Sequence, residues 1–507
     1  MDFTPIVRPY FTRIARRTDS WSHREEEIQR NVLRSLLCRG AVSEPGRAYR
    51  FAEMAKAKDV SEAFSSAVPM KSYEEIRSDV LRMVNGERDV LWRGVCRSFA
   101  QSSGTSGGRS KYIPITTDSL YRCHYKGSAD CVAHYLRHNP ESRLFSGKAL
   151  VLGGSFASQL KSKDPRVHIG DLSATLIDRM NPLANLFRVP SKRVALMSDW
   201  STKLPALVKA SEYENITNIS GVPSWFLTVI NEVMKSRGVD KISDVWHNLE
   251  VFFHGGISFG PYREEYTRIT DPAKMHFVET YNASEGFFAV QNDPDDTAML
   301  LIVDNDIYYE FIPIDGPDTD PIPLWVVESG RVYEMIITSS NGLWRYHLGD
   351  TVRVESVNPV KIRIAGRTKS FINAFGEELM EENAERAIGD VCSALDCSIR
   401  NYTAAPVFAH NGHRGLHQWL VEWEKTPADV RQFADMLDKR LRELNSDYDA
   451  KRNGTIFLDP LEAITVPDGT FDRWLSSVGN RKLGGQRKVP RLSNDRRIAD
   501  AVLSLLK

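Results

Sequence analysis

Residues 102–111, SSGTSGGRSK, combine chemical groups suited to the oxygens of a polyphosphate. Three glycines let the backbone approach a ligand, hydroxyl and N–H groups donate hydrogen bonds, and Lys111 adds a positive charge. The stretch departs from the common phosphate loop G-x-x-x-x-G-K-[ST], because Arg109 stands where the second glycine would be. This departure disfavours a Walker-type NTPase. A flexible Gly/Ser surface loop is the alternative interpretation.

A second chemical cluster, residues 281–286 with the sequence YNASEG, follows an apolar stretch. The Tyr281 ring is suited to covering a nucleobase, and the Glu285 carboxylate to holding Mg²⁺ against phosphate oxygens. The alternative is a strand end with a buried tyrosine and a solvated glutamate.

A third cluster contains an acid that follows a glycine, Asp350 in residues 344–350, WRYHLGD. One carboxylate that accepts hydrogen bonds from both ribose hydroxyls is a common use of such an acid. Arg367 lies seventeen residues later, where a smaller domain would begin, and is able to brace the same ribose or a phosphate. The alternatives are an aspartate in a hairpin turn and a solvated arginine.

Near the end of the chain, residues 484–491 place basic side chains after two glycines, GGQRKVPR. Such a loop can deliver a cation to developing negative charge when two domains close. A basic, solvated tail is the alternative.

The elements that would position these segments alternate between helical and extended patterns. Apolar residues at helical spacing predict helices over 25–37, 73–84, 118–138 and 225–236. Apolar runs predict buried strands over 148–152, 249–254 and 276–282, and glycine pairs follow the first two runs. This alternation predicts a layered α/β domain.

Between about residues 299 and 364 the pattern changes to short strands. Residues 299–303 and 307–314 flank Asp304-Asn305-Asp306, a hairpin signal, and further strands are predicted over 332–338, 351–357 and 360–364. We expect an antiparallel subdomain here, such as a small barrel.

Residues 366–369, GRTK, predict a hinge. Beyond it, a helix over 377–388 with an acidic first turn, a strand over 419–423 and an amphipathic helix over 430–444 predict a smaller α/β domain. We therefore expect an N-terminal domain over 1–367, containing the antiparallel subdomain, and a mobile C-terminal domain over 368–507.

Bulk composition is that of a globular protein, and 507 residues suffice for two to four domains. Lysine plus arginine and aspartate plus glutamate both number 66, so no net field favours nucleic acid or anionic membranes. The six cysteines form no C-x-x-C pair and indicate a reducing compartment. Residues 1–17 lack the apolar core of a secretory signal, and no run reaches the ~20 apolar residues of a membrane helix. We expect a cytoplasmic protein.

Together, the segments SSGTSGGRSKYIP, YNASEG, RYHLGD and QRKVPR resemble the acyl acid amido synthetases of the auxin-responsive Gretchen Hagen family, which are adenylate-forming enzymes. ISGVPSW at 219–225 and FGEELMEENAERAI at 375–388 fit as well. The motifs occur in the family's order from about Ser102 to Arg491. The resemblance implies a two-step ligase that uses ATP and Mg²⁺. ATP adenylates a carboxylic acid with release of pyrophosphate, and the amine of an amino acid then attacks the acyl-adenylate, giving an amide and AMP.

The resemblance also implies a role for each candidate residue. The phosphates would be bound by Ser102, Ser103, Gly104, Thr105, Ser106, Gly107 and Lys111. Gly255, Gly256 and Tyr281 would line the adenine, Ser284 would approach the α-phosphate, and Glu285 would bind Mg²⁺. Asp350 would hold the ribose hydroxyls with Arg367 beside it, and Lys488, or else Lys482, would act on the adenylation transition state. Asn282-Ala283 and His347-Leu348 depart from the most common family residues without removing any of these groups.

The sequence does not identify the carboxylic acid or the amino acid. We expect residues 156–199 and the surroundings of Ser224 and Trp225 to shape the acyl pocket. One alternative function is acyl transfer to coenzyme A, and another is a catalytically silent protein that senses an acyl ligand. The presence of Lys111, Glu285, Asp350 and Lys488 argues against the silent protein.

Overall fold

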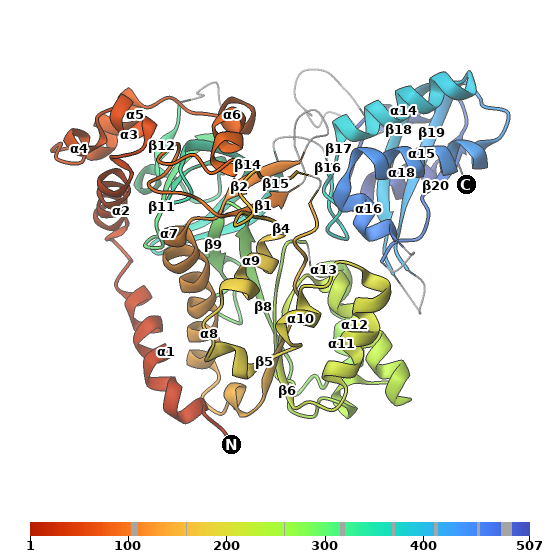
Figure 1. Ribbon diagram of the computed structural model, residues 1–507. Helices are drawn as coiled ribbons and strands as arrows, with labels where there is room; N and C mark the ends of the chain where they lie inside the picture. The colour runs from red at the N-terminus through yellow and green to blue at the C-terminus, as the bar shows by residue number, and fades with distance from the viewer. Residues whose placement is uncertain are drawn as a thin grey trace. The chain divides into compact units, whose positions relative to one another are not determined.

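The computed structural model describes residues 1–102, 110–158, 160–257, 259–314, 320–367, 371–409, 414–453, 457–477 and 489–506. The chain divides into two compact units, drawn in Figure 1. The first comprises Met1–Ser102, Lys111–Gly256 and Tyr266–Thr368, and the second comprises the rest. Both units combine helices with β-sheets, which confirms the predicted α/β class with a large N-terminal part and a smaller C-terminal part.

The main sheet of the first unit has twelve strands within the described residues, in the order β12-β11-β13-β14-β15-β10-β9-β8-β7-β6-β3-β5. Its parallel strands are β3 (Lys148–Val151), β5 (Arg188–Val189), β6 (Ile216–Gly221), β7 (Val251–Gly255) and β8 (His276–Ala283). Four of the five residues of β7 are buried, as expected for a parallel strand covered on both faces. In Figure 1, α1 (Thr4–Asp19) and α8 (Tyr125–His138) lie on one side of these strands, and α11 (Trp200–Ser211) and α12 (Pro223–Arg237) on the other.

Helix α12 shows how the local sequence ends one strand and begins the next helix. Pro223 occupies the first turn, where a backbone N–H would have no helical partner. Gly238 follows the last turn with a left-handed φ of 65°, which glycine adopts without strain. Between them, Phe226, Ile230 and Val233 are fully buried and fix the helix against the sheet. The helix predicted over 225–236 is thus confirmed with one additional residue at its C-terminal end and two at its start.

The antiparallel strands continue the same sheet and do not close into the small barrel suggested by the sequence. They are β9 (Gly286–Val290), β10 (Met299–Leu301), β11 (Ile307–Pro313), β12 (Ile322–Pro323), β13 (Val332–Ser339), β14 (Leu343–Val357) and β15 (Val360–Arg367). The hairpin predicted around Asp304-Asn305-Asp306 is wrong, because β10 pairs with β9 and β15, whereas β11 pairs with β12 and β13. Asn305 instead donates to the Phe287 carbonyl, and Asp306, with φ 61°, binds Arg39. The segment therefore reverses the chain without pairing the strands beside it.

The helices before the main sheet follow the predicted pattern. Helix α2 (Glu25–Gly40) and helix α6 (Tyr73–Val84) are present, and α6 begins with a capping box made by Ser72 and Glu75. The helix predicted over 118–138 comprises α7 (Thr117–Ser119), a π-helical turn (Leu120–His124) and α8. Buried Gln29 ties α2 to the sheet by donating to the carbonyls of Val303 and Ile307 at 2.7 and 2.9 Å.

The second unit contains a three-stranded sheet in the order β18-β19-β20, made of Ser398–Val407, Leu416–Lys425 and Glu462–Val466. Helices α14 (Glu381–Leu395) and α15 (Val430–Leu444) accompany it. The helix predicted to begin at 377 begins at Glu381, because the Glu377 carboxylate accepts hydrogen bonds from the N–H groups of Ala374 and Phe375 and from buried His417. Glu377 thus stabilises a turn before the helix.

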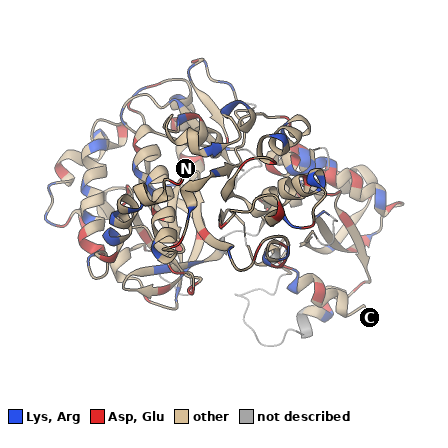
Figure 2. Ribbon diagram, turned by 90° about the horizontal axis from the view of Figure 1, so that it is seen from below, with Lys and Arg blue, Asp and Glu red and all other residues tan. Residues whose placement is uncertain are grey.

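Basic and acidic residues are interspersed along the ribbon in Figure 2, as the balanced composition leads one to expect. Within the described residues, every helix is too short or too polar to cross a lipid bilayer. All six cysteines are free thiols.

Candidate active site

The carboxyl ends of four neighbouring parallel strands, β3, β6, β7 and β8, meet at one edge of the main sheet. Gly255 ends β7 and is followed by Gly256, while Ser284 and Glu285 follow the end of β8. Open α/β sheets bind ligands outside the carboxyl ends of their strands. The fold therefore brings two of the predicted segments to the edge where such a ligand would lie.

Packing explains the glycine at 255, and backbone conformation explains the glycine at 256. A Cβ atom on Gly255 would lie 2.4 Å from the carbonyl oxygen of Thr280 on β8, so only glycine fits there. Gly256 has a φ of 82°, which disfavours other residues. The Thr280 hydroxyl donates to the His254 carbonyl at 3.0 Å and holds the two strands together at this level. Any ligand at this point would meet a wall made of backbone.

The two candidate residues Ser284 and Glu285 form the tip of the β8–β9 hairpin, because Ala283 and Gly286 are paired directly across it. Asn341, which is fully buried, holds this tip: its side-chain amide donates to the carbonyls of Ser284 at 3.4 Å and Glu285 at 3.1 Å. The Glu285 side chain is itself buried. The turn is therefore fixed by a residue that the sequence motifs did not indicate.

Tyr281 and Asp350, from two different motifs, are joined by a direct hydrogen bond. The Tyr281 hydroxyl donates to Oδ2 of Asp350 at 2.6 Å, and both residues are buried. The Tyr281 ring also packs against Phe288, with ring centroids 4.8 Å apart. A buried tyrosine was the alternative interpretation of this position, and its hydroxyl here orients the carboxylate that was expected to hold a ribose.

Asp350 lies directly opposite Arg367 in the antiparallel pairing of β14 and β15. Gly349 precedes Asp350 within β14, where the pairing with β13 is irregular. Its φ of 85° is a left-handed conformation that glycine adopts without strain. The backbone thus brings the predicted acid and the predicted arginine side by side; for Arg367 only the backbone is described.

Lys111 begins β2 (Lys111–Pro114) and pairs with Ser102, the last residue of β1 (Ser98–Ser102). Its Nζ atom lies 3.3 Å from the Tyr346 hydroxyl, and 5.8 and 5.9 Å from the ring centroids of Tyr73 and Tyr346. The lysine side chain is buried, so these rings surround a cation with little water. Burial also raises the pKa of Tyr73 to about 12, which keeps this phenol neutral beside the lysine.

Two of the predicted segments, 102–111 and 281–286, therefore contact β14, which contains the third segment, or the turn before it. Asn341 contacts the tip after β8, Tyr346 contacts Lys111, and Asp350 contacts Tyr281. The sequence motifs missed Asn341, Tyr73 and the role of Tyr346, because a neutral side chain that holds another residue gives no chemical signature of its own. The remaining candidates, Ser103, Gly104, Thr105, Ser106, Gly107, Lys482 and Lys488, lie outside the described residues.

The Glu285 carboxylate suits an Mg²⁺ ion that is held by one carboxylate together with phosphate oxygens. Within the described residues there is no group of three or more His, Cys, Asp or Glu side chains arranged to enclose a metal ion. Mg²⁺ in nucleotide sites is commonly held by one or two carboxylates together with the substrate phosphates. Buried Glu285, at the tip after β8, is a suitable ligand of this kind.

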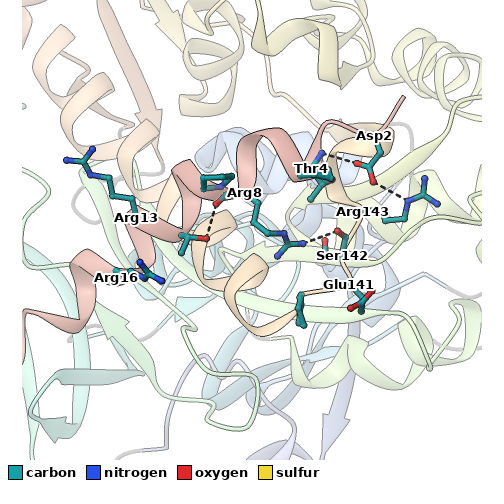
Figure 3. A pocket seen from close by; sticks show the side chains of 12 residues that line it. Asp2, Thr4, Arg8, Arg13, Arg16, Glu141, Ser142 and Arg143 are labelled. Atoms are coloured by element: carbon teal, nitrogen blue, oxygen red, sulfur yellow. Dashed lines mark hydrogen bonds and ion pairs between the residues drawn. The ribbon is translucent and has the colours of Figure 1, made fainter.

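A surface groove of about 820 Å³ contains none of these motifs and lies between α1 and residues 140–143 (Figure 3). Two of its arginines are bonded to neighbouring groups. The Arg8 guanidinium donates to the carbonyls of Leu136 and Ser142 at 2.8 and 3.0 Å, and Arg143 bonds Asp2 at 3.2 Å. The groove contains none of the candidate residues, and we assign it no catalytic role.

Three domain models of one family cover most of the chain. The GH3 family N-terminal domain matches residues 15–275, the GH3 family central domain matches 300–367, and the GH3 family C-terminal domain matches 382–497. The chain therefore belongs to the GH3 family. The resemblance that the motifs indicated is confirmed.

Curated relatives of the chain are plant enzymes of low sequence identity and nearly full coverage. A probable indole-3-acetic acid-amido synthetase GH3.1 from Oryza sativa subsp. japonica is 23% identical over 92% of this chain and 87% of its own. The 4-substituted benzoates-glutamate ligase GH3.12 from Arabidopsis thaliana is 24% identical over 85% of this chain and 87% of its own.

Two solved structures share the fold. An acyl acid amido synthetase, AtGH3.15, in complex with 2,4-DB covers 95% of this chain and 94% of its own, with a TM-score of 0.59 and 20% identity. A 2-hydroxyisobutyryl-CoA ligase in its thioesterification state covers 96% of this chain and 92% of its own, with a TM-score of 0.54 and 14% identity. These likenesses establish the arrangement of elements.

Proposed function

We propose that the chain is an ATP- and Mg²⁺-dependent acyl acid amido synthetase. It adenylates a carboxylic acid with release of pyrophosphate and transfers the acyl group to the amine of an amino acid, giving an amide and AMP. Relatives named as amido synthetases support this over nearly the whole chain. The single structural observation that supports it most is the 2.6 Å bond between Tyr281 and Asp350, which joins two of the motifs.

The nucleotide lies along the edge formed by β7, β8 and β14 in this proposal. Gly255 and Gly256 form the backbone wall beside the adenine, and Tyr281 lines the adenine while its hydroxyl holds Asp350. Asp350 accepts hydrogen bonds from the ribose hydroxyls, with Arg367 opposite it. Ser284 meets the α-phosphate.

The phosphates are neutralised by cations, because a carboxylate must attack an α-phosphate of the same sign. Lys111 and the loop residues Ser102, Ser103, Gly104, Thr105, Ser106 and Gly107 bind the phosphates. Mg²⁺, held by Glu285, supplies further positive charge when bound. Lys488, or else Lys482, stabilises the charge that develops in adenylation.

The domain boundary and the location belong to the same proposal. The adenylation domain spans 1–367 with its antiparallel part at about 299–364, and a mobile C-terminal domain spans 368–507. A domain that closes over the acyl-adenylate protects this easily hydrolysed intermediate from water. Six free cysteines suit a cytoplasmic location.

Acid-dependent exchange of pyrophosphate into ATP tests the first step. We expect exchange with at least one acid from a panel of indole-3-acetate, substituted benzoates and alkanoates, and an amide by product mass once amino acids are added. A thioester formed with coenzyme A and no amide would instead assign the chain to acyl-CoA ligases. ATP binding without exchange for any acid would favour a silent ligand-binding protein.

A further inference from the structure

Lys203 is a buried lysine at the N-terminal end of α11, with three acceptors for its ammonium group. Nζ donates to the carbonyl oxygens of Gly153 at 2.5 Å, Met197 at 3.0 Å and Gly154 at 3.3 Å. An ammonium has three N–H donors, so each acceptor receives one. Burial lowers its pKa to about 8, while the Asp171 carboxylate acts in the opposite direction. Burying the ammonium costs free energy, and its three bonds tie α11 to two backbone segments, at Gly153–Gly154 and at Met197.

The glycine pair at the end of β3 is held from both sides. Lys203 binds its carbonyls, and the Ser173 hydroxyl accepts from the Gly154 N–H at 2.8 Å. The Asp171 carboxylate accepts from the N–H of Ser155 at 2.6 Å, and a Cβ atom on Gly154 would overlap this carboxylate at 2.0 Å. The glycine lets the carboxylate reach the backbone. Side chains on two helices thus fix the course of the chain as it leaves β3.

Lys203 also contacts the ring of Trp200, which packs against Trp225. Its Nζ lies 5.0 Å from the centroid of the Trp200 ring, within range of a cation–π contact. Trp200 in turn meets Trp225, the third residue of α12, edge to face with centroids 5.6 Å apart. The two rings join α11, which carries Lys203, to α12, which follows β6.

Gly153, which Lys203 binds, follows β3 at the level of the predicted nucleotide wall. Val151 pairs with Ser220, and Ser220 pairs with Phe253, so Gly153 and Gly255 each lie two residues beyond the same register. β3 is three strand positions from β8, which corresponds to about 14 Å at ordinary strand spacing. An acid whose carboxylate meets the α-phosphate at Ser284 would extend along this edge from β8 toward β6 and β3.

We propose that Lys203 is a positioning residue for the acyl acid, holding the Gly153–Gly154 backbone and Trp200 so that Trp200 and Trp225 close the far end of the acyl pocket. The inference rests on the proposed function and adds that the two rings limit the length of the acid. The chemical class is an apolar carboxylic acid that ends against an aromatic wall.

Steady-state kinetics of pyrophosphate exchange with the full chain test the inference, with straight-chain alkanoates of increasing length, benzoate and indole-3-acetate as probes. Lys203→Met should raise the KM for the best acid at least tenfold, with the KM for ATP and kcat within about threefold of wild type. Lys203→Arg, which keeps the charge and donors, should restore much of this loss. Lys192→Met is the matched control, because Lys192 is half-exposed and paired with Asp178.

Trp200→Ala provides a second test if Lys203→Met does not fold. Trp200→Ala should shift the preferred alkanoate toward longer chains, since a wall is removed, whereas a purely structural role would lower activity with all acids alike. An unchanged length preference in Trp200→Ala, or equal losses for acid and ATP in folded Lys203→Met, would overturn the inference. Absence of exchange in the wild-type chain would overturn the proposed function itself, and this inference with it.

Discussion

Asp350 and Tyr281 show how much of a site depends on contacts between side chains that lie far apart in the sequence. The motif around Asp350 indicated an acid near a sugar, and the motif around Tyr281 indicated an aromatic near a base. Neither indicated that the phenol would donate to the carboxylate at 2.6 Å. Both residues are buried, so this bond helps to fix the orientation of the Asp350 carboxylate.

Asp350→Ala should weaken ATP binding and abolish discrimination between ATP and 2′-deoxy-ATP, because the ribose hydroxyls lose their acceptor. Tyr281→Phe should raise the KM for ATP by about three- to tenfold, which corresponds to one ordinary hydrogen bond. The measurement is the KM for each nucleotide in pyrophosphate exchange. Tyr309→Phe is the control, since this buried phenol bonds the Ile302 carbonyl instead. Retained discrimination in Asp350→Ala would place the ribose elsewhere.

At the scale of elements, the parallel strands and the helices between them were predictable, because each has a continuous apolar run or a helical stripe of its own. The pairing of the antiparallel strands was not. The signal at Asp304-Asn305-Asp306 correctly indicated a reversal, but the choice of partner depended on Asn305 and Asp306 binding Phe287 and Arg39. The start of α14 was missed for a similar reason, since Glu377 is used by a turn and by His417.

The tip after β8 is an element whose position depends on one amide, and Asn341→Asp tests it. The change removes a donor and sets a carboxylate against the carbonyls of Ser284 and Glu285. We expect exchange activity to fall about tenfold or more, as for a lost buried hydrogen bond of about 1–3 kcal/mol. The Mg²⁺ concentration for half-maximal activity should rise as Glu285 shifts. An unchanged value in Asn341→Asp would separate the tip from metal binding.

At the scale of the whole molecule, the sequence indicated a large and a small part and the class of chemistry, but not that one continuous sheet would carry both the parallel and the antiparallel strands. β14 lies four strand positions from β8, so the contact between Tyr281 and Asp350 shows that the sheet curves and brings the two strands together. Helices on both faces bury the polar groups that hold this arrangement. That burial also makes the first unit sensitive to acid.

Burial lowers the pKa of His124 and of His134 from 6.5 to about 4. Between these values the unfolded chain binds more protons, so stability falls as the pH drops from 6.5 toward 4, by up to about 3 kcal/mol for each imidazole. Burial raises the pKa of Asp130 from 3.8 to about 6, which offsets one of these losses. The temperature of the thermal unfolding midpoint should therefore decrease as the pH is lowered below 6.5. His134→Gln, which cannot take up a proton, should flatten this dependence, and an equally steep profile in the variant would contradict the assignment.

A crystal structure of the full chain with a stable acyl-adenylate analogue tests the central claim most directly, because the claim is that separate segments bind one nucleotide. We predict the ribose hydroxyls within hydrogen-bond distance of the Asp350 carboxylate, the phosphate at Ser284, and the acyl group directed along the sheet edge toward Trp225. An analogue bound elsewhere, with Asp350 and Glu285 facing different cavities, would contradict the account.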